Sequence, residues 1–184
     1  MISLFLDSNA WDLFFERKID LYLELPGDEF SIQITREAEF EILCMPTEKR
    51  QYVETVFEAK AIPTDMYFGF YDESLPLEQQ RFAGFNCGRF ASDEELTLLC
   101  EERSSLGSTK RPTGLYKNEA DVSLAARSMV SAVVTCDGKK VIKRAKTRCG
   151  GAVIDLKKWT EGSLAAFIRV ELSNSDGNPR IKIG

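Results

Sequence analysis

The chain opens with Ile2-Ser3-Leu4-Phe5-Leu6-Asp7-Ser8-Asn9, and this stretch decides the fold class. Residues 2–6 form a short, mainly apolar run, which is typical of a strand buried on both faces of a parallel sheet. Ser8 or Asn9 is then expected to cap a helix that runs to about Lys18. A buried strand, an acidic residue and a capped helix together predict the first unit of an α/β fold.

The same order of strand and helix returns further along the chain. The alternating Phe30-Ser31-Ile32-Gln33-Ile34 predicts a second strand, with Thr35 as the cap of the next helix and Thr47 as the cap of the one after it. Further strands are expected at 132–135 and 151–156, and helices at 36–43, 48–61, 93–103, from Asn118 onward and over 139–148. This alternation predicts an α/β sandwich of three layers, with a central, mainly parallel sheet and helices on both faces.

The length of 184 residues suits one domain. We predict one α/β unit over residues 1–158 and a C-terminal extension over 159–184 that packs on the same unit. This extension is either a helix or a hairpin, and the alternation in 167–172 and 180–183 favours the hairpin. The aromatic run at 66–71 is expected to form strand core rather than a surface for stacking bases.

Composition excludes several classes of site. The chain has no histidine, so a Ser-His-Asp triad, a histidine metal site and a histidine general base are all ruled out. The five cysteines are widely spaced, which favours reduced thiols and a cytoplasmic location over a disulfide framework or a zinc ribbon. No apolar run approaches the length of a membrane span and the N-terminus lacks the features of a signal peptide, so no membrane partner is expected.

The charge is unevenly distributed along the chain. Residues 1–92 carry 8 Lys and Arg against 17 Asp and Glu, whereas residues 93–184 carry 16 against 12. Six of the ten residues in 139–148 are basic and none is acidic. An acidic protein with one dense basic segment is typical of a polyanion binder that keeps carboxylates for a metal, although a solvated helix face gives the same composition.

Four carboxylates follow separate elements of the predicted fold. Asp7 follows the first strand and Asp137 the strand at 132–135, while Glu41 lies in the helix after the second strand and Asp121 at a helix start. All four are expected at the carboxyl edge of the sheet, where α/β folds bind ligands. Grouped carboxylates repel one another unless a cation neutralises them, and oxygen ligands favour Mg²⁺ or Mn²⁺.

Each acid also has a purely structural interpretation. Asp7 is placed to cap a helix, Glu41 to lie on a helix surface, Asp121 to stabilise a helix start and Asp137 to form a turn with Gly138. No single position decides between the two interpretations. The joint placement of the four favours the metal site.

In this arrangement the chain resembles the PIN-domain ribonucleases. The resemblance is carried by the apolar strand with Asp7-Ser8-Asn9, by Thr35-x5-Glu41-Ile42-Leu43, by Ala120-Asp121 and by Val134-Thr135-Cys136-Asp137, in the family's order. It implies that Asp7, Glu41, Asp121 and Asp137 are the catalytic, metal-binding acids, supported by Asn9 and Thr135. It further implies an endoribonuclease in which Mg²⁺ or Mn²⁺ activates water for attack on a phosphodiester.

The same resemblance implies RNA as the substrate and a role as the toxin of a toxin–antitoxin pair. The open partner predictions are an antitoxin protein and a second copy of the chain. The cations expected to hold the RNA backbone are Lys110, Arg111, Lys117, Lys139, Lys143 and Lys146. The spacing of the last three predicts that they share one face of a helix.

Three other functions remain open from the sequence. A PIN-like module that binds RNA or protein without cutting is disfavoured because all four acids are present. A DNA-directed 5′ nuclease of similar fold is disfavoured because no arch motif is seen. A phosphate-binding protein of the receiver or phosphatase kind is disfavoured because Asn9 stands where a phosphatase would carry its second aspartate, and no glycine-rich phosphate loop is present.

Overall fold

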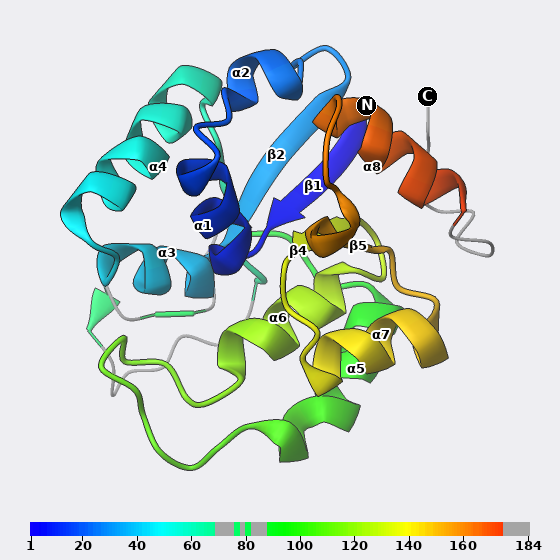
Figure 1. The fold of residues 1–184 in the computed structure, drawn as a ribbon. Helices are drawn as coiled ribbons and strands as arrows, with labels where there is room; N and C mark the ends of the chain where they lie inside the picture. Colours follow the sequence, from blue (N-terminus) through cyan, green and yellow to red (C-terminus); the bar gives the residue numbers. More distant parts are fainter. Residues whose placement is uncertain (69–75, 78–79, 82–87, 175–184) are drawn as a thin grey trace.

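A computed structural model of the chain describes residues 1–68, 76–77, 80–81 and 88–174. Its five strands form one sheet in the order β3-β2-β1-β4-β5, and every neighbouring pair is parallel (Figure 1). The strands are β1 (Ile2–Leu6), β2 (Phe30–Thr35), β3 (Thr64–Asp65), β4 (Ala132–Thr135) and β5 (Val153–Asp155).

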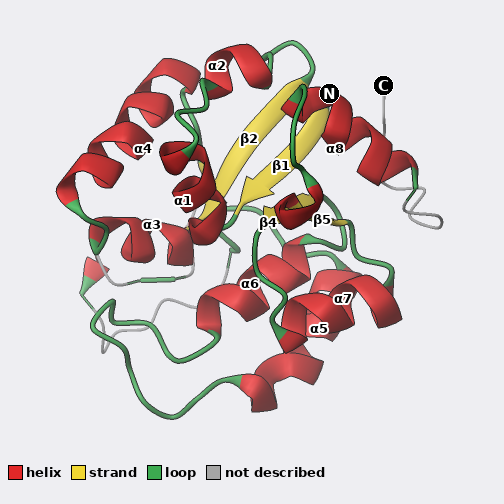
Figure 2. Cartoon of the chain, in the orientation of Figure 1, coloured by secondary structure: helices red, strands yellow, loops and turns green. Residues whose placement is uncertain are grey.

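Helices cover both faces of this sheet, as Figure 2 shows. They are α1 (Ser8–Glu16), α2 (Leu21–Glu24), α3 (Arg36–Leu43), α4 (Thr47–Lys60), α5 (Asp93–Glu102), α6 (Glu119–Arg127), α7 (Lys140–Cys149) and α8 (Leu164–Ser173). Side chains of α1 to α4 and α8 pack into the core on one face, and side chains of α5 to α7 pack into the core on the other.

Neighbouring residues of each central strand enter opposite cores. Leu4 and Leu6 of β1 lie in the first core and Phe5 in the second, and Val134 and Val133 of β4 divide in the same way. Because both faces of β1 and β4 are buried, these two strands have nearly continuous apolar sequences, whereas β2 alternates and its apolar residues all enter the first core. The predicted fold class, a parallel α/β sheet between two layers of helices, is confirmed.

The helix starts are confirmed in part. Thr35 caps α3, since its side chain accepts a hydrogen bond from the Ala38 N–H. The first helix begins at Ser8, so Asp7 occupies the capping position in place of Ser8 or Asn9, yet its side chain makes no capping bond. Pro46 rather than Thr47 precedes α4, which agrees with the tolerance of helix starts for proline.

The C-terminal extension forms a helix over 164–173, so the preference for a hairpin is wrong. Ser163 caps α8 by accepting a bond from Ala166 N–H, and Leu164, Ile168 and Leu172 enter the first core at helical spacing. This spacing competes with the shorter alternation that favoured a strand. The second half of the expected hairpin, 180–183, lies outside the described residues.

Between β3 and α6, the described residues are organised around α5. Ser92 and Glu95 form a reciprocal capping box at its start. Of the aromatic run at 66–71, Tyr67 is buried and Phe68 half-buried, while 69–71 lie outside the described residues.

The thiols of Cys44, Cys100, Cys136 and Cys149 are free. None of the described helices is long and apolar enough to cross a bilayer.

The order of the strands defines where a ligand would bind. From β1 the chain moves to β2 and β3 on one side, and then to β4 and β5 on the other. In open α/β sheets this reversal leaves a crevice beyond the carboxyl ends of the two central strands. Here those ends are followed by Asp7 and by the turn that contains Asp137.

Candidate functional site

Asp7 is fixed at the end of β1 by bonds to the neighbouring strand. Its backbone N–H donates to the Val134 carbonyl at 3.0 Å, and its side-chain Oδ2 accepts from the Thr135 hydroxyl at 2.6 Å. The amide of Asn9 donates to the same oxygen at 2.7 Å. The Asp7 residue is 4% exposed, so its carboxylate is oriented before any ligand arrives.

Asn9 and Thr135 also shape the turn after β4. The Asn9 side-chain oxygen accepts the Cys136 backbone N–H at 2.6 Å, and the Thr135 hydroxyl oxygen accepts the Asp137 backbone N–H at 2.8 Å. The structure therefore places both residues against Asp7, in positions that suit the supporting role the sequence assigns to them. These bonds also explain why the Asp7 side chain does not cap α1.

Asp121 and Asp137 meet at the ammonium group of Lys139. The Lys139 Nζ lies 2.9 and 3.0 Å from the two oxygens of Asp121 and 3.3 Å from Asp137 Oδ2. Asp121 lies in the first turn of α6 and is 5% exposed, whereas the side chain of Lys139 is 40% exposed. Burial lowers the pKa of Lys139, but the hydrogen bonds and charges of the two aspartates raise it above its ordinary value.

Glu41 completes the group from α3. Burial raises its pKa, a hydrogen bond from Ser8 lowers it, and the charges of Asp7 and Asp121 raise it, with a net increase. The pKa of Asp7 is also raised, chiefly by burial and further by the charge of Asp121, against the bonds from Thr135 and Asn9. The structure thus brings the four predicted acids into one electrostatic neighbourhood, with more negative charge than Lys139 can balance.

The donor set suits a hard divalent ion, because it consists of carboxylate oxygens held at a sheet edge. Within the described residues, however, no three acidic or cysteine side chains lie close enough together to hold one ion between them. The ammonium of Lys139, rather than a third acid, sits against Asp121 and Asp137. The residues therefore fit Mg²⁺ or Mn²⁺ in chemistry, and coordination by all four requires side chains to move.

The basic segment is placed differently from the prediction. The helix α7 begins at Lys140, so Lys139 precedes it. The Lys143 side chain passes Gly138, its Cε lying 3.1 Å from where a Cβ on that glycine would stand. Lys146 donates to the Val153 carbonyl at 2.7 Å, at the start of β5 and therefore at the opposite edge of the sheet. Lys139 is thus the residue just before α7, and the shared face with Lys143 and Lys146 stays a prediction.

The other predicted cations lie on the loop that leads to α6. Lys110 and Tyr116 form an isolated bridge, and the Lys110 ammonium lies 5.6 Å from the centre of the Tyr116 ring. The backbone of Arg111 donates to the Leu115 carbonyl, and the carbonyl of Lys117 accepts from Gly107. All three cations are exposed. Since α6 carries Asp121, this loop enters the helix that supplies one of the acids.

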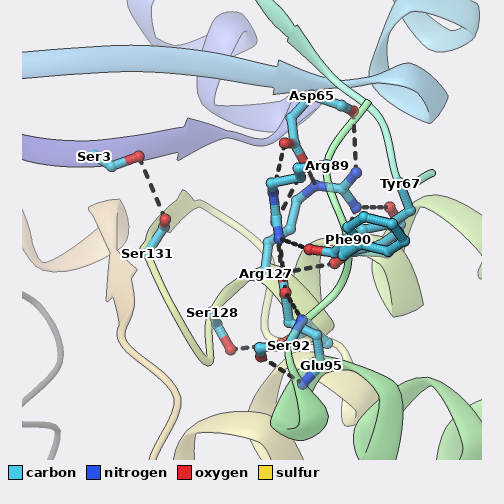
Figure 3. Close-up of polar contacts among 12 residues, drawn as sticks. Ser3, Asp65, Tyr67, Arg89, Phe90, Ser92, Glu95, Arg127, Ser128 and Ser131 are labelled. Carbon is cyan, nitrogen blue, oxygen red and sulfur yellow. Dashed lines mark hydrogen bonds and ion pairs between the residues drawn. The ribbon is translucent and has the colours of Figure 1, made fainter. Parts of the chain in front are cut away.

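A second polar cluster, which sequence reasoning missed, lies at the other end of α6 (Figure 3). Arg127 is 1% exposed and donates to Asp65 at 2.7 Å. Asp65 also accepts from Arg89 at 2.7 Å, and Arg89 donates to both oxygens of Glu95 at 2.6 and 2.8 Å. Tyr67 donates to Glu95 at 2.8 Å, and the guanidinium groups of Arg127 and Arg89 lie 4.3 Å and 4.9 Å from the centre of its ring.

We call Asp65, Tyr67, Arg89, Glu95 and Arg127 the paired network. Burial raises the pKa of Glu95, but the bonds and charge of Arg89 lower it more, so the acid stays ionised. The network joins the end of β3 to α5 and α6. Its sequence signal is faint: a lone basic residue in the last turn of a helix ordinarily indicates a solvated charge that suits the helix dipole.

Comparison with solved structures shows a likeness of fold, whereas comparison of sequences finds no match. No protein-family model matches the chain and no curated protein matches it. Among solved structures it is similar to a chain in the crystal structure of VapBC2 from Rickettsia felis bound to a DNA fragment from their promoter. The alignment covers 84% of this chain and 98% of that chain, with 15% identity and a TM-score of 0.44. At this identity and TM-score, only the residues of the site bear on function.

Proposed function

We propose that the chain is a metal-dependent endoribonuclease of the PIN type, which hydrolyses RNA phosphodiester bonds at the carboxyl edge of its sheet. The observation that carries the proposal is the excess of negative charge at this edge. Asp7, Glu41, Asp121 and Asp137 gather where α/β folds bind ligands, and two of them have raised pKa values. Carboxylates with raised pKa values at such an edge favour a functional site over an accidental one.

The residues divide into three roles under this proposal. The four acids would hold Mg²⁺ or Mn²⁺, which would supply an activated water and neutralise charge on the phosphate. Asn9 and Thr135 orient Asp7 through the bonds described above. Lys143 and the exposed cations of the 110–117 loop would contact the RNA backbone without reading its sequence.

Neither a histidine nor a reactive thiol is found among the described residues at this edge. Histidine is absent from the whole sequence. Cys136 is next to Asp137, but burial and the nearby charges of Asp155 and Asp7 raise the pKa of its thiol to about 11. A thiol with so high a pKa is almost entirely protonated at neutral pH and is a poor nucleophile. Hydrolysis by a cation-activated water is therefore the chemistry that these residues favour.

The test is cleavage of total RNA by the purified chain in Mg²⁺ and in EDTA, with the cut ends mapped by sequencing. We expect defined cuts in Mg²⁺, none in EDTA and none with Asp121→Asn. Asp28→Asn is the matched control, because Asp28 is exposed and precedes β2 at the opposite edge of the sheet. Cleavage by Asp121→Asn at the wild-type rate would refute the assignment.

The same experiment separates the other functions. Metal-dependent cutting of flapped DNA but not RNA would indicate a 5′ nuclease, and RNA binding without cutting would indicate a non-catalytic module. The proposal also includes an inhibitory antitoxin protein and a role as a toxin. Its test is expression of the chain with and without the small reading frame next to its gene, if one is present. Growth arrest by the chain that the neighbour relieves, together with co-elution, is the expected result.

A further inference from the structure

Lys139 makes direct ionic contacts with two of the four acids. Its Nζ contacts both oxygens of Asp121, at 2.9 and 3.0 Å, and reaches Asp137 Oδ2 at 3.3 Å. The two aspartates come from α6 and from the turn after β4, so this one ammonium joins two separate elements. Its partners are two of the acids that the proposed function assigns to the divalent ion.

We propose that Lys139 is a tethered counter-ion of Asp121 and Asp137, which holds the two carboxylates together in the metal-free protein and competes with the divalent ion for their oxygens. This inference rests on the proposed function. Two like-charged carboxylates that share a site destabilise it unless a cation lies between them. In the structure the cation between these two is the ammonium of Lys139.

Competition follows from the occupied oxygens. Both Asp121 oxygens accept bonds from Lys139, so a divalent ion that binds either of them is repelled by the ammonium unless the lysine moves away. The lysine side chain is 40% exposed, and the residue stands just before α7, so the side chain can swing into solvent without unwinding the helix. The buried Asp121 side chain, which is 8% exposed, stays where it is.

The neighbouring lysines lack this arrangement. Lys140 is the first residue of α7 and is exposed. Lys143 passes Gly138, and Lys146 bonds to the carbonyl of Val153. Lys140 therefore provides a control with the same charge at the adjacent position. Lys139→Met preserves the length of the side chain and removes its charge, and Lys139→Gln removes the charge but retains a polar end.

The experiment is calorimetric titration of Mn²⁺ and of Mg²⁺ into metal-free wild type, Lys139→Met, Lys139→Gln and Lys140→Gln. We expect both Lys139 variants to bind the ion about tenfold more tightly than wild type, within the usual range of coupling between two ligands. Lys140→Gln should bind like wild type. In EDTA the Lys139 variants should melt about 2–4 °C lower, as expected for a loss of about 1 kcal/mol in a domain of this size.

A second measurement needs no substitution. The acetylation rate of each lysine amine, read by mass spectrometry, should rise for Lys139 when Mg²⁺ is added and stay constant for Lys140. The counter-ion role of Lys139 would be overturned if both Lys139 variants bound the metal no more tightly than wild type. It would also be overturned if Mg²⁺ left the acetylation rate of Lys139 unchanged. Either result would leave the proposed function intact. Absence of metal binding in wild type and variants alike would overturn both.

Discussion

The two ends of α6 carry polar clusters of opposite electrostatic character. At its first turn, Asp121 joins three other acids whose described counter-charge is a single lysine, and the pKa values of Asp7 and Glu41 are raised. At its last turn, Arg127 enters the paired network, in which two guanidinium groups face two carboxylates and the pKa of Glu95 is lowered. One helix of nine residues thus separates a site with excess negative charge from a cluster in which positive and negative charges are balanced.

This difference indicates what each cluster does. A buried acid whose charge is matched by a guanidinium needs nothing from solution, so the paired network joins β3, α5 and α6 as part of the fold. Acids that repel one another are stabilised by an added cation, so the carboxyl edge is suited to bind one. Burial alone does not distinguish the two, because Asp7 and Glu95 are both almost fully buried. The balance of charge does.

The largest expected effect comes from breaking the paired network. Arg127→Ala leaves Asp65 without its buried partner and should lower the free energy of unfolding by about 3–5 kcal/mol, as measured by urea denaturation. A double variant, Arg127→Met with Asp65→Asn, removes both charges and should recover part of this loss. A loss below about 1 kcal/mol in Arg127→Ala would contradict this expectation and show that Arg89, which also bonds to Asp65, suffices to pair it.

The next prediction concerns pH in EDTA, where the two clusters should respond with opposite sign. The folded-state pKa of Glu95 lies below its ordinary value of 4.5, so its stabilisation is present above that pH and is lost as pH falls through the folded value. The folded-state pKa of Glu41 lies above 4.5, so stability is lost as pH rises from 4.5 through the folded value. At neutral pH we expect Glu95→Gln to be less stable than wild type and Glu41→Gln more stable. Shifts of the same sign in urea denaturation would contradict the comparison.

A smaller effect is expected from the cations around the carboxyl edge. In an Asp121→Asn background that prevents cutting, Lys143→Gln should reduce the slope of log affinity against log salt by about 0.7 if its ammonium contacts one phosphate of single-stranded RNA. Lys146→Gln is the control within the same helix, because Lys146 bonds to Val153 at the other edge of the sheet. If Lys143→Gln and Lys146→Gln reduced the salt slope equally, the RNA would contact α7 along its whole length.

The smallest effect is predicted for Cys136. Its thiol has no assigned role as ligand or nucleophile, and its pKa is raised to about 11 by burial and nearby acids. Cys136→Ser should therefore retain metal-dependent cleavage close to that of wild type. An alkylated Cys136 should be less active than the serine variant, since the adduct would crowd Asp137. Loss of cleavage in the serine variant would reveal chemistry at the thiol.

The fold was predictable because its elements have local signatures. The buried strand 2–6 is apolar on both faces, and Thr35 caps the helix that follows the next strand. The acids after β1 and β4 could be placed together because parallel strands end at the same edge. Their catalytic role stays a prediction. The sequence pattern of 164–173 favours a strand although the segment is a helix, because a short apolar segment can satisfy the periods of both.

The paired network and the position of Lys139 could not be predicted from local patterns. Arg127 meets Asp65 from 62 residues away, and Arg89 meets Asp65 from 24 residues away. No periodicity joins such partners. Lys139 fits a helical spacing with Lys143 and Lys146, but it lies one residue before the helix, and the attraction of Asp121 and Asp137 decides where its side chain points.

We propose that the carboxyl edge carries more negative charge than the fold can balance and that a divalent ion completes it. The most direct measurement is the free energy of unfolding of Asp7→Asn relative to wild type, in EDTA and in saturating Mg²⁺ at neutral pH. The amide keeps one oxygen for the bonds from Asn9 and Thr135, so the change removes charge while leaving that geometry available.

We expect the difference in unfolding free energy between Asp7→Asn and wild type to change sign between the two conditions. In EDTA the variant should be more stable than wild type, because a buried, repelled charge is gone. In Mg²⁺ at 100 times its dissociation constant, wild type should gain about 2.7 kcal/mol and become the more stable of the two, whereas the variant should gain much less. If Asp7→Asn is less stable than wild type by the same amount in both conditions, the edge is a balanced part of the fold and the claim is contradicted.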